Sequence, residues 1–132
     1  RRLAAEREEI TIVTDQIGVP NWSCALAAAT VRIVGTGLPA VAARSGLYHL
    51  SCTGQASWYD FARAIVGDAP RPWIVPIMAA EFPWPARRPA YGVLATARFE
   101  ATFGFTLPDW RHALASCVAS RAYSRSVTKR PS

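Results

Sequence analysis

The chain has 132 residues, of which 51% are hydrophobic and 18% are charged, and its formal net charge is +6. This hydrophobic fraction is too high for an intrinsically disordered protein, and the length suits a single small domain. The sequence has neither an apolar run long enough to span a bilayer nor the pattern of a signal peptide, so we expect a cytoplasmic protein without a membrane segment.

The positive charge is concentrated at the C-terminal end of the chain. Residues 111–132 hold five of the fifteen basic residues and none of the nine acidic residues. The last segment, 122–132, is rich in Ser, Arg and Lys, which predicts a basic flexible tail after a folded region at 1–121. Such a tail favours a solvated end over a base-reading surface, so we do not expect nucleic acid as a partner.

Three cysteines, Cys24, Cys52 and Cys117, are far apart in the sequence. No two of them have the spacing of metal ligands, and neither His49 nor His112 completes such a set, so no metal site is predicted. Separated cysteines in odd number are typical of reduced, buried or half-buried thiols in a cytosolic protein.

The first predicted elements are a strand, a loop and a helix. The apolar run 10–13, Ile-Thr-Ile-Val, predicts the strand, and the stretch 15–22 that follows contains a Gly and a Pro, which predict the loop. Polar side chains at strand ends commonly contact ligands in α/β proteins, which makes Gln16 a candidate binding residue. Asn21 is expected to cap the helix, which ends near Gly35.

A connection and a second strand are predicted next. Residues 36–45 are mostly small and include Gly and Pro, which predicts a connection without regular structure. The apolar run 47–50 predicts a brief strand buried in a parallel sheet. His49 in this run is expected to be a hydrogen-bonded structural residue rather than a catalyst.

The clearest helix covers residues 58–66. Apolar residues recur there at positions i, i+3, i+4, i+7 and i+8, beginning with Trp58, so they form one apolar face. Ser57 and Asp60 stand at the spacing of a capping box, and Gly67 is placed to end the helix.

The rest of the chain predicts an extended segment, a long loop and two helices. Residues 73–75 are expected to be extended, and the proline-rich loop 79–92 is long enough to carry function. Three aromatic residues indicate that this loop is ordered, namely Phe82, Trp84 and Tyr91. One helix is expected at 96–103, ending at Gly104, and another after Asp109. We therefore predict an α/β fold with short strands and about four to five helices.

Six motifs fall in one order along the chain. They are Asp-Gln-x-Gly-x-Pro at 15–20, Gly-Leu-Tyr-His-Leu at 46–50, Ser-Trp-Tyr-Asp-Phe-Ala-Arg at 57–63, Ala-Arg-Arg-Pro at 86–89, Thr-Phe-Gly at 102–104 and Leu-Pro-Asp-Trp at 107–110. In this order they resemble the C-terminal half of the dTDP-4-dehydrorhamnose reductases, a family of extended short-chain dehydrogenase/reductases. The resemblance covers about residues 1–121 and implies the C-terminal, sugar-nucleotide-binding portion of an extended Rossmann-type reductase, without its N-terminal dinucleotide-binding half.

The chain begins with Arg1 and its only methionine is Met78, so we expect a fragment of a longer protein. The strands predicted at 10–13 and 47–50 would normally complete a sheet begun upstream, which leaves their edges open. We therefore expect the isolated chain to be marginally stable or to aggregate.

The resemblance also implies a function and a set of substrate-binding residues. The full enzyme reduces dTDP-4-dehydro-L-rhamnose to dTDP-L-rhamnose with NADPH or NADH. In extended members of the superfamily an Arg-Pro pair contacts the diphosphate, which points to Arg88 first and Arg87 second, and a guanidinium suits two phosphate oxygens. Gln16 is the candidate for hydrogen bonds to the sugar or phosphate, and Trp22 for the pocket wall. The alternatives are solvated loop charges and a loop amide tied to its own backbone.

The catalytic and cofactor motifs of the superfamily are not found in this chain. Its chemistry needs a Tyr with a Lys four residues later, whereas the four tyrosines here are followed at that distance by Cys52, Arg63, Ala95 and Val127. Residues 35–40 match the letters of a dinucleotide-binding turn, but they follow a helical pattern rather than a strand. We therefore assign no catalytic or cofactor-binding residue, and the missing half would hold the cofactor.

The chain departs from the family's pattern at several polar positions. Asn21 replaces a Thr, Cys24 and Ala25 replace an Arg-Asp pair, and Gly92 and Ala95 stand where Ser and Asp are usual. These losses leave a second hypothesis open, a non-catalytic binding or regulatory module of the same superfamily. A dTDP-sugar and the missing N-terminal half are the expected partners, and a homodimer is also open.

Overall fold

The computed structural model describes residues 6–82, 86 and 88–120 of the chain. Within these residues it contains five α-helices, a short 3-10 turn and four short strands. In chain order these are β1 (Glu9–Val13), β2 (Ile17–Gly18), α2 (Ser23–Val34), α3 (Leu38–Ala43), β3 (Ala56–Ser57), α4 (Trp58–Val66), β4 (Trp73–Ile77), η1 (Ala79–Glu81), α5 (Ala97–Phe103) and α6 (Trp110–Ala119). The predicted α/β class is confirmed. The predicted tail, 122–132, lies outside the described residues.

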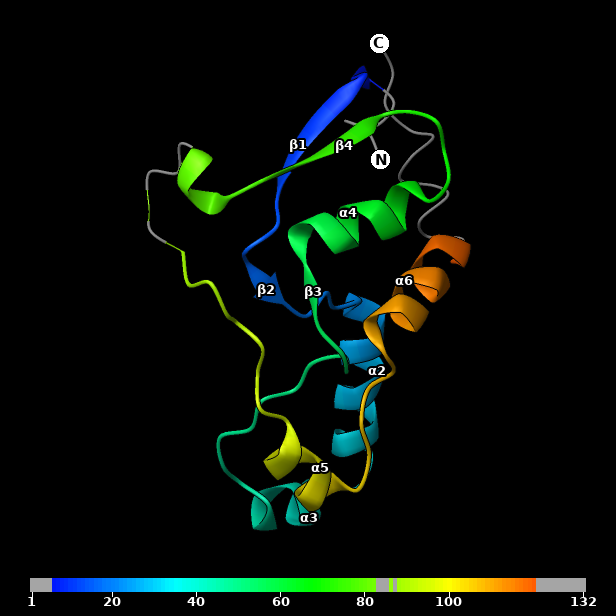
Figure 1. Cartoon of the computed structure of the whole chain (residues 1–132). Helices are drawn as coiled ribbons and strands as arrows, with labels where there is room; N and C mark the ends of the chain where they lie inside the picture. The colour runs from blue at the N-terminus through cyan, green and yellow to red at the C-terminus, as the bar shows by residue number, and fades with distance from the viewer. Residues whose placement is uncertain (1–5, 83–85, 87, 121–132) are drawn as a thin grey trace.

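Strands β1 and β4 lie side by side at one end of the molecule, as a parallel pair (Figure 1). Val13 is paired with Ile77, and Thr14 continues the pairing by donating its N–H to the Ile77 carbonyl at 3.0 Å. A parallel pair needs a long crossover, which here runs from β2 through α4. The extended segments predicted at these two places are confirmed.

The predicted strand at 47–50 is wrong. The structure has no strand in this segment, and 77% of the Leu47 surface is exposed. The Tyr48 hydroxyl donates to the Arg44 carbonyl at 2.8 Å, and its ring meets Phe103 edge-on, so the segment packs on helices rather than on a sheet. A short apolar run does not by itself distinguish a strand from other buried structure, and the partner of β1 is β4 instead. His49 is exposed.

The connection predicted at 36–45 contains a helix, α3. Pro39 lies in its first turn, where the missing N–H costs nothing and the fixed φ suits a helix. A Gly and a Pro close together therefore mark the start of a helix here, whereas the prediction took them for a loop.

Asn21 does not cap α2, as the sequence predicted. The N-cap residue is Trp22, which makes no side-chain cap bond. Asn21 instead accepts a hydrogen bond from the Cys52 N–H at 2.7 Å and donates to the Val19 carbonyl at 3.0 Å. Its amide therefore joins the loop before α2 to the segment before β3, a contact across 31 positions that no local pattern could show.

The helix α4 forms as predicted. Ser57 Oγ accepts from the Asp60 N–H at 3.0 Å, and the Asp60 carboxylate accepts from the Ser57 N–H at 3.0 Å, which completes the capping box. Gly67 follows the helix with φ 65°, a value that favours glycine. This cap fixes the backbone where α4 begins.

The last two helices, α5 and α6, also form as predicted. Gly104 ends α5 in the left-handed conformation, and the Asp109 carboxylate caps α6 by accepting from the Arg111 N–H at 2.8 Å. None of the helices in the described residues has the length and apolar composition of a membrane span.

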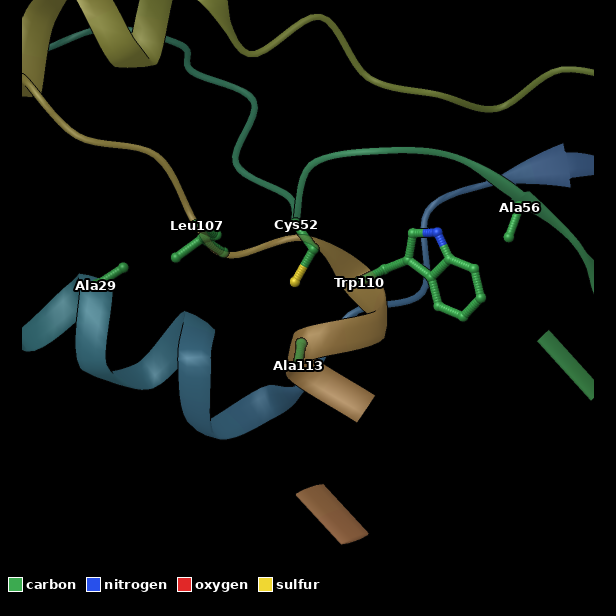
Figure 2. Close-up of a cluster of buried hydrophobic side chains, with 6 residues drawn as sticks. All are labelled: Ala29, Cys52, Ala56, Leu107, Trp110 and Ala113. Carbon is green, nitrogen blue, oxygen red and sulfur yellow. The ribbon is translucent and has the colours of Figure 1, made fainter. Parts of the chain in front are cut away.

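The hydrophobic core joins α2, α6 and the segments around β3. Its buried members are Ala29, Cys52, Ala56, Leu107, Trp110 and Ala113. Figure 2 shows the Trp110 indole extending from the start of α6 toward Ala56, and its Nε1 donates to the Gln55 carbonyl at 3.2 Å. Gly54 has φ 80°, and a Cβ there would lie 2.6 Å from the Asp109 carboxylate, so only glycine fits beside the start of α6.

Candidate functional site

The corner between β1 and α2 places Gln16 in the interior of the molecule. Asp15 accepts a hydrogen bond from the Ala79 N–H at 2.8 Å, which ties the corner to η1. Ile17 pairs with Ser57 across β2 and β3, which brings the corner against the start of α4. Gln16, between these two attachments, is only 8% exposed.

The loop that carries Arg88 is attached to the same corner. The Ile17 N–H donates to the Ala90 carbonyl at 2.8 Å, and the Gly92 N–H donates to the Ile17 carbonyl at 2.8 Å. The Tyr91 hydroxyl donates to the Gln55 side chain at 3.1 Å. Residues 88–92 therefore lie alongside β2, although they are at least 70 positions away in sequence.

Two neighbouring cavities lie at this junction. The first has a volume of about 520 Å³, and its lining includes polar groups of Asn21, Ser57 and Arg88. The second, of about 450 Å³, is lined mainly by apolar residues of β1 and α4 and by Phe82. Among the residues that the structure describes, four line both cavities, namely Gln16, Trp58, Phe61 and Arg88.

The structure brings together two of the four predicted binding residues. Gln16 and Arg88 line both cavities. Arg87 lies outside the described residues. Trp22 lines neither cavity; it packs against the core and borders a smaller cavity of about 70 Å³ beside Trp110. Whether Gln16 and Arg88 bind a ligand stays a prediction.

Gln16 has the properties of a ligand-binding amide. Within the described part of the chain, the Gln16 side chain has no hydrogen-bond partner. Every fully buried side-chain N or O atom in that part has a hydrogen-bond partner. The Gln16 amide atoms must therefore keep some accessible surface, and the residue faces the cavities. An amide offers two donor hydrogens and an acceptor oxygen, which suits a hydroxyl or phosphate group.

Ser57 caps α4, as expected, and its hydroxyl hydrogen is donated to a neighbouring side chain. Ser57 Oγ donates to the Asp60 carboxylate at 2.7 Å while it accepts from the Asp60 N–H. Hydrogen bonds from the Ser57 hydroxyl and the Ser57 N–H hold the pKa of the Asp60 carboxyl below its ordinary value, with a smaller contribution from Arg111. Asp60 is therefore an ionised cap and not a proton donor at neutral pH.

Trp58 and Phe61 are site residues that the sequence did not reveal. The helical pattern placed both on one apolar face, yet 55% of the Trp58 surface is exposed and both side chains line the two cavities. The one available signal was an aromatic residue directly after a helix N-cap, which is too common to identify a site.

The structure does not support a dinucleotide site at residues 35–40. This stretch joins α2 to the six-residue helix α3, so it does not connect a strand to a helix as the motif requires. Among the described residues, no group of three or more His, Cys, Asp or Glu side chains could hold a metal ion. The three cysteines are free thiols.

Comparison with known proteins identifies the family. The model of a family described as the RmlD substrate binding domain matches residues 1–123. The chain belongs to this family. A dTDP-4-dehydrorhamnose reductase from Burkholderia thailandensis is 45% identical, in a match that covers 89% of this chain and 43% of that protein. The chain therefore spans about two fifths of the length of this RmlD-family relative.

Two solved structures of dTDP-4-dehydrorhamnose reductases share the fold. The Bacillus anthracis reductase, in complex with NADP, is 33% identical with a TM-score of 0.75, over 87% of this chain and 39% of its own. The Clostridium acetobutylicum protein is 29% identical with a TM-score of 0.75, and the match covers 97% of this chain and 42% of that protein. This RmlD substrate-binding domain corresponds to the C-terminal part of these reductases, which confirms the predicted family and fold.

Proposed function

We propose that the chain is the substrate-binding part of a reductase that converts dTDP-4-dehydro-L-rhamnose to dTDP-L-rhamnose with NADPH or NADH. One observation carries this proposal: Gln16 and Arg88, separated by 72 positions, line the same cavity in a chain of the RmlD substrate-binding family. The relatives named dTDP-4-dehydrorhamnose reductase, one of them bound to NADP, support it.

The proposed roles follow from the chemistry of the side chains. The planar Arg88 guanidinium can bind two oxygens of the diphosphate at once, with Arg87 as a second cation. Gln16 donates hydrogen bonds to the sugar or to a phosphate oxygen. Trp22 supports the corner from the core side, because it packs against the core cluster rather than lining the larger cavities.

The reduction itself requires groups that this chain does not provide. NADPH, held by the remainder of the reductase, would supply a hydride to C4 of the sugar while the ketone oxygen takes up a proton. No tyrosine here has a lysine four residues later, and residues 35–40 do not fit a dinucleotide turn. The chain alone is therefore expected to be inactive, and its contribution is to hold the nucleotide and orient the ketone.

The partners and compartment belong to the same proposal. A dTDP-sugar and the remainder of the reductase are the partners, and a homodimer stays open. Three free thiols, one of them exposed, fit a reducing compartment such as the cytoplasm.

Calorimetric titration of dTDP into the chain tests the binding. Replacing Arg88 with Ala should lower the affinity for dTDP about 10- to 100-fold, because a charge-assisted contact to phosphate is lost. Arg63→Ala is the matched control, since Arg63 is exposed on α4 and lines neither cavity. No binding by the wild-type chain, or equal binding by the Arg88 variant, would contradict the proposal.

The second candidate, a non-catalytic binding module, is favoured by one feature of the first cavity. Gly92 lines it without a side chain, where the family usually has Ser. A fusion of this chain to the preceding part of the Burkholderia relative separates the candidates. Oxidation of NADPH with the dTDP-keto sugar supports the reductase, whereas dTDP binding without turnover supports the module.

A further inference from the structure

Trp58 is an exposed aromatic side chain on a rigid support. It is the first residue of α4, and the residues before it, Ala56 and Ser57, are only 6% and 5% exposed. The capping box fixes the backbone at this point. The residue is nevertheless 55% exposed, so its indole offers a flat apolar surface to a ligand at little cost in conformational entropy.

The neighbouring aromatic residue, Phe61, differs in one respect. Both residues line both cavities, but the Phe61 ring also meets Trp110 edge-on, with 6.1 Å between the ring centroids. In the described part of the chain the Trp58 ring makes no such aromatic contact. Phe61 is therefore partly held by the core, whereas packing against the core does not account for the position of the Trp58 ring.

Trp58 lines the same cavities as an arginine and a buried amide. Arg88 brings a planar positive charge, and Gln16 brings hydrogen-bonding atoms that have no protein partner in the described residues. A ligand that satisfies a cation, an amide and an exposed aromatic ring needs an anionic group, polar groups and a flat ring of its own. A nucleoside diphosphate has all three.

We infer that Trp58 stacks on the nucleobase of the bound nucleotide. This inference rests on the proposed function, because it assigns the base-binding part of the same site. Stacking on an aromatic ring tolerates any base, since every base has a π-face. Trp58 therefore strengthens the binding of nucleoside diphosphates in general and does not select thymine.

Calorimetric titration of the whole chain with dTDP, ADP and inorganic pyrophosphate tests the inference. Trp58→Ala should weaken the binding of dTDP and ADP about 5- to 100-fold and leave pyrophosphate binding unchanged. Trp58→Phe should recover most of the lost affinity, because a ring is restored. Trp73→Ala is the control, since Trp73 is also exposed, at 68%, and lines neither cavity.

The possible failures are distinguishable. If Trp58→Ala binds dTDP like the wild type while Arg88→Ala does not, the stacking is wrong and the proposed binding site stands. If Trp58→Ala weakens pyrophosphate and dTDP equally, Trp58 acts on the shape of the site and not on the base. If the wild-type chain binds none of the three probes, the proposed function fails and the stacking fails with it.

Discussion

The starts of α4 and α6 have the same local design and opposite surroundings. Each helix begins with a tryptophan directly after a capping residue, Ser57 before Trp58 and Asp109 before Trp110. Trp110 is 1% exposed and donates its indole N–H to the Gln55 carbonyl, whereas Trp58 is 55% exposed beside the two cavities. The difference lies in what the rest of the chain places over each ring. We interpret the start of α6 as the structural anchor of the domain and the start of α4 as part of its binding site.

The sharpest test of this contrast is to truncate each tryptophan. Trp110→Ala should lower the free energy of unfolding by about 3–5 kcal/mol, because it empties the core and leaves the Gln55 carbonyl without its donor. Trp58→Ala should lower it by less than about 1 kcal/mol. Urea unfolding followed by circular dichroism measures both, and equal losses would contradict the contrast.

Two glycines extend the comparison to the backbone. Gly54→Ala should cost about 1–3 kcal/mol, because φ is 80° and the new Cβ would lie 2.6 Å from the Asp109 carboxylate. Gly18→Ala is the matched change on the cavity side, where a Cβ meets nothing within 4 Å, and it should cost less than about 1 kcal/mol. Urea unfolding measures both losses of stability. A larger loss for Gly18→Ala than for Gly54→Ala would contradict the interpretation of the start of α6 as the structural anchor.

The cap of α4 predicts a smaller effect with a pH dependence. Ser57→Ala should cost about 1 kcal/mol and raise the pKa of Asp60 toward its ordinary value of 3.8, because the hydroxyl bond is lost. A depressed carboxyl pKa stabilises the fold above that ordinary value, and this contribution is lost as the pH falls through the folded-state pKa. The variant should therefore lose less stability on acidification than the wild type.

Carboxyl titration by NMR, with unfolding at several acidic pH values, checks the prediction for Ser57. An equal pKa of the Asp60 carboxyl in the wild type and in Ser57→Ala would contradict this prediction. Glu81 is an internal reference, because its carboxylate accepts from the Met78 N–H and makes no bond to Ser57.

The smallest effect is expected at Gly92. A Cβ there would lie 3.7 Å from the Ile17 carbonyl, an ordinary contact, so Gly92→Ser should change stability by less than about 0.5 kcal/mol. The new hydroxyl would extend into the first cavity and should raise dTDP affinity about fivefold, the effect of one neutral hydrogen bond. Lower affinity would show that the cavity is already filled by the ligand at this point.

Local patterns predicted the elements whose signals are local. The capping box of Ser57 and Asp60, the glycine after α5 and the apolar run of β1 each depend on residues a few positions apart, and all three formed as expected. The prediction of a strand at 47–50 was wrong, because strand pairing depends on which distant segment lies beside the edge of β1. That segment is β4. Asn21 failed as a cap for the same reason, since its partner is Cys52.

The site could be predicted only as separate pieces. Gln16 and Arg88 were candidates because their side chains and the motif order pointed to them, but the two backbone bonds between Ile17 and residues 90 and 92 are what bring them together. The prediction placed Trp22 in the pocket wall, whereas Trp58 is the tryptophan that lines the cavities. The loop tryptophan packs on the core, while the helical one faces the cavities. Amphipathic spacing shows that a residue faces inward, but not whether a cavity lies there.

The most direct test of the binding site is an NMR titration of the ¹⁵N-labelled chain with dTDP. We predict that the side-chain amide signals of Gln16 and the indole N–H signal of Trp58 shift with the nucleotide concentration. The indole signal of Trp110, which is bonded to the Gln55 carbonyl, should stay in place. Shifts at Trp110 with Gln16 and Trp58 unchanged would contradict the account.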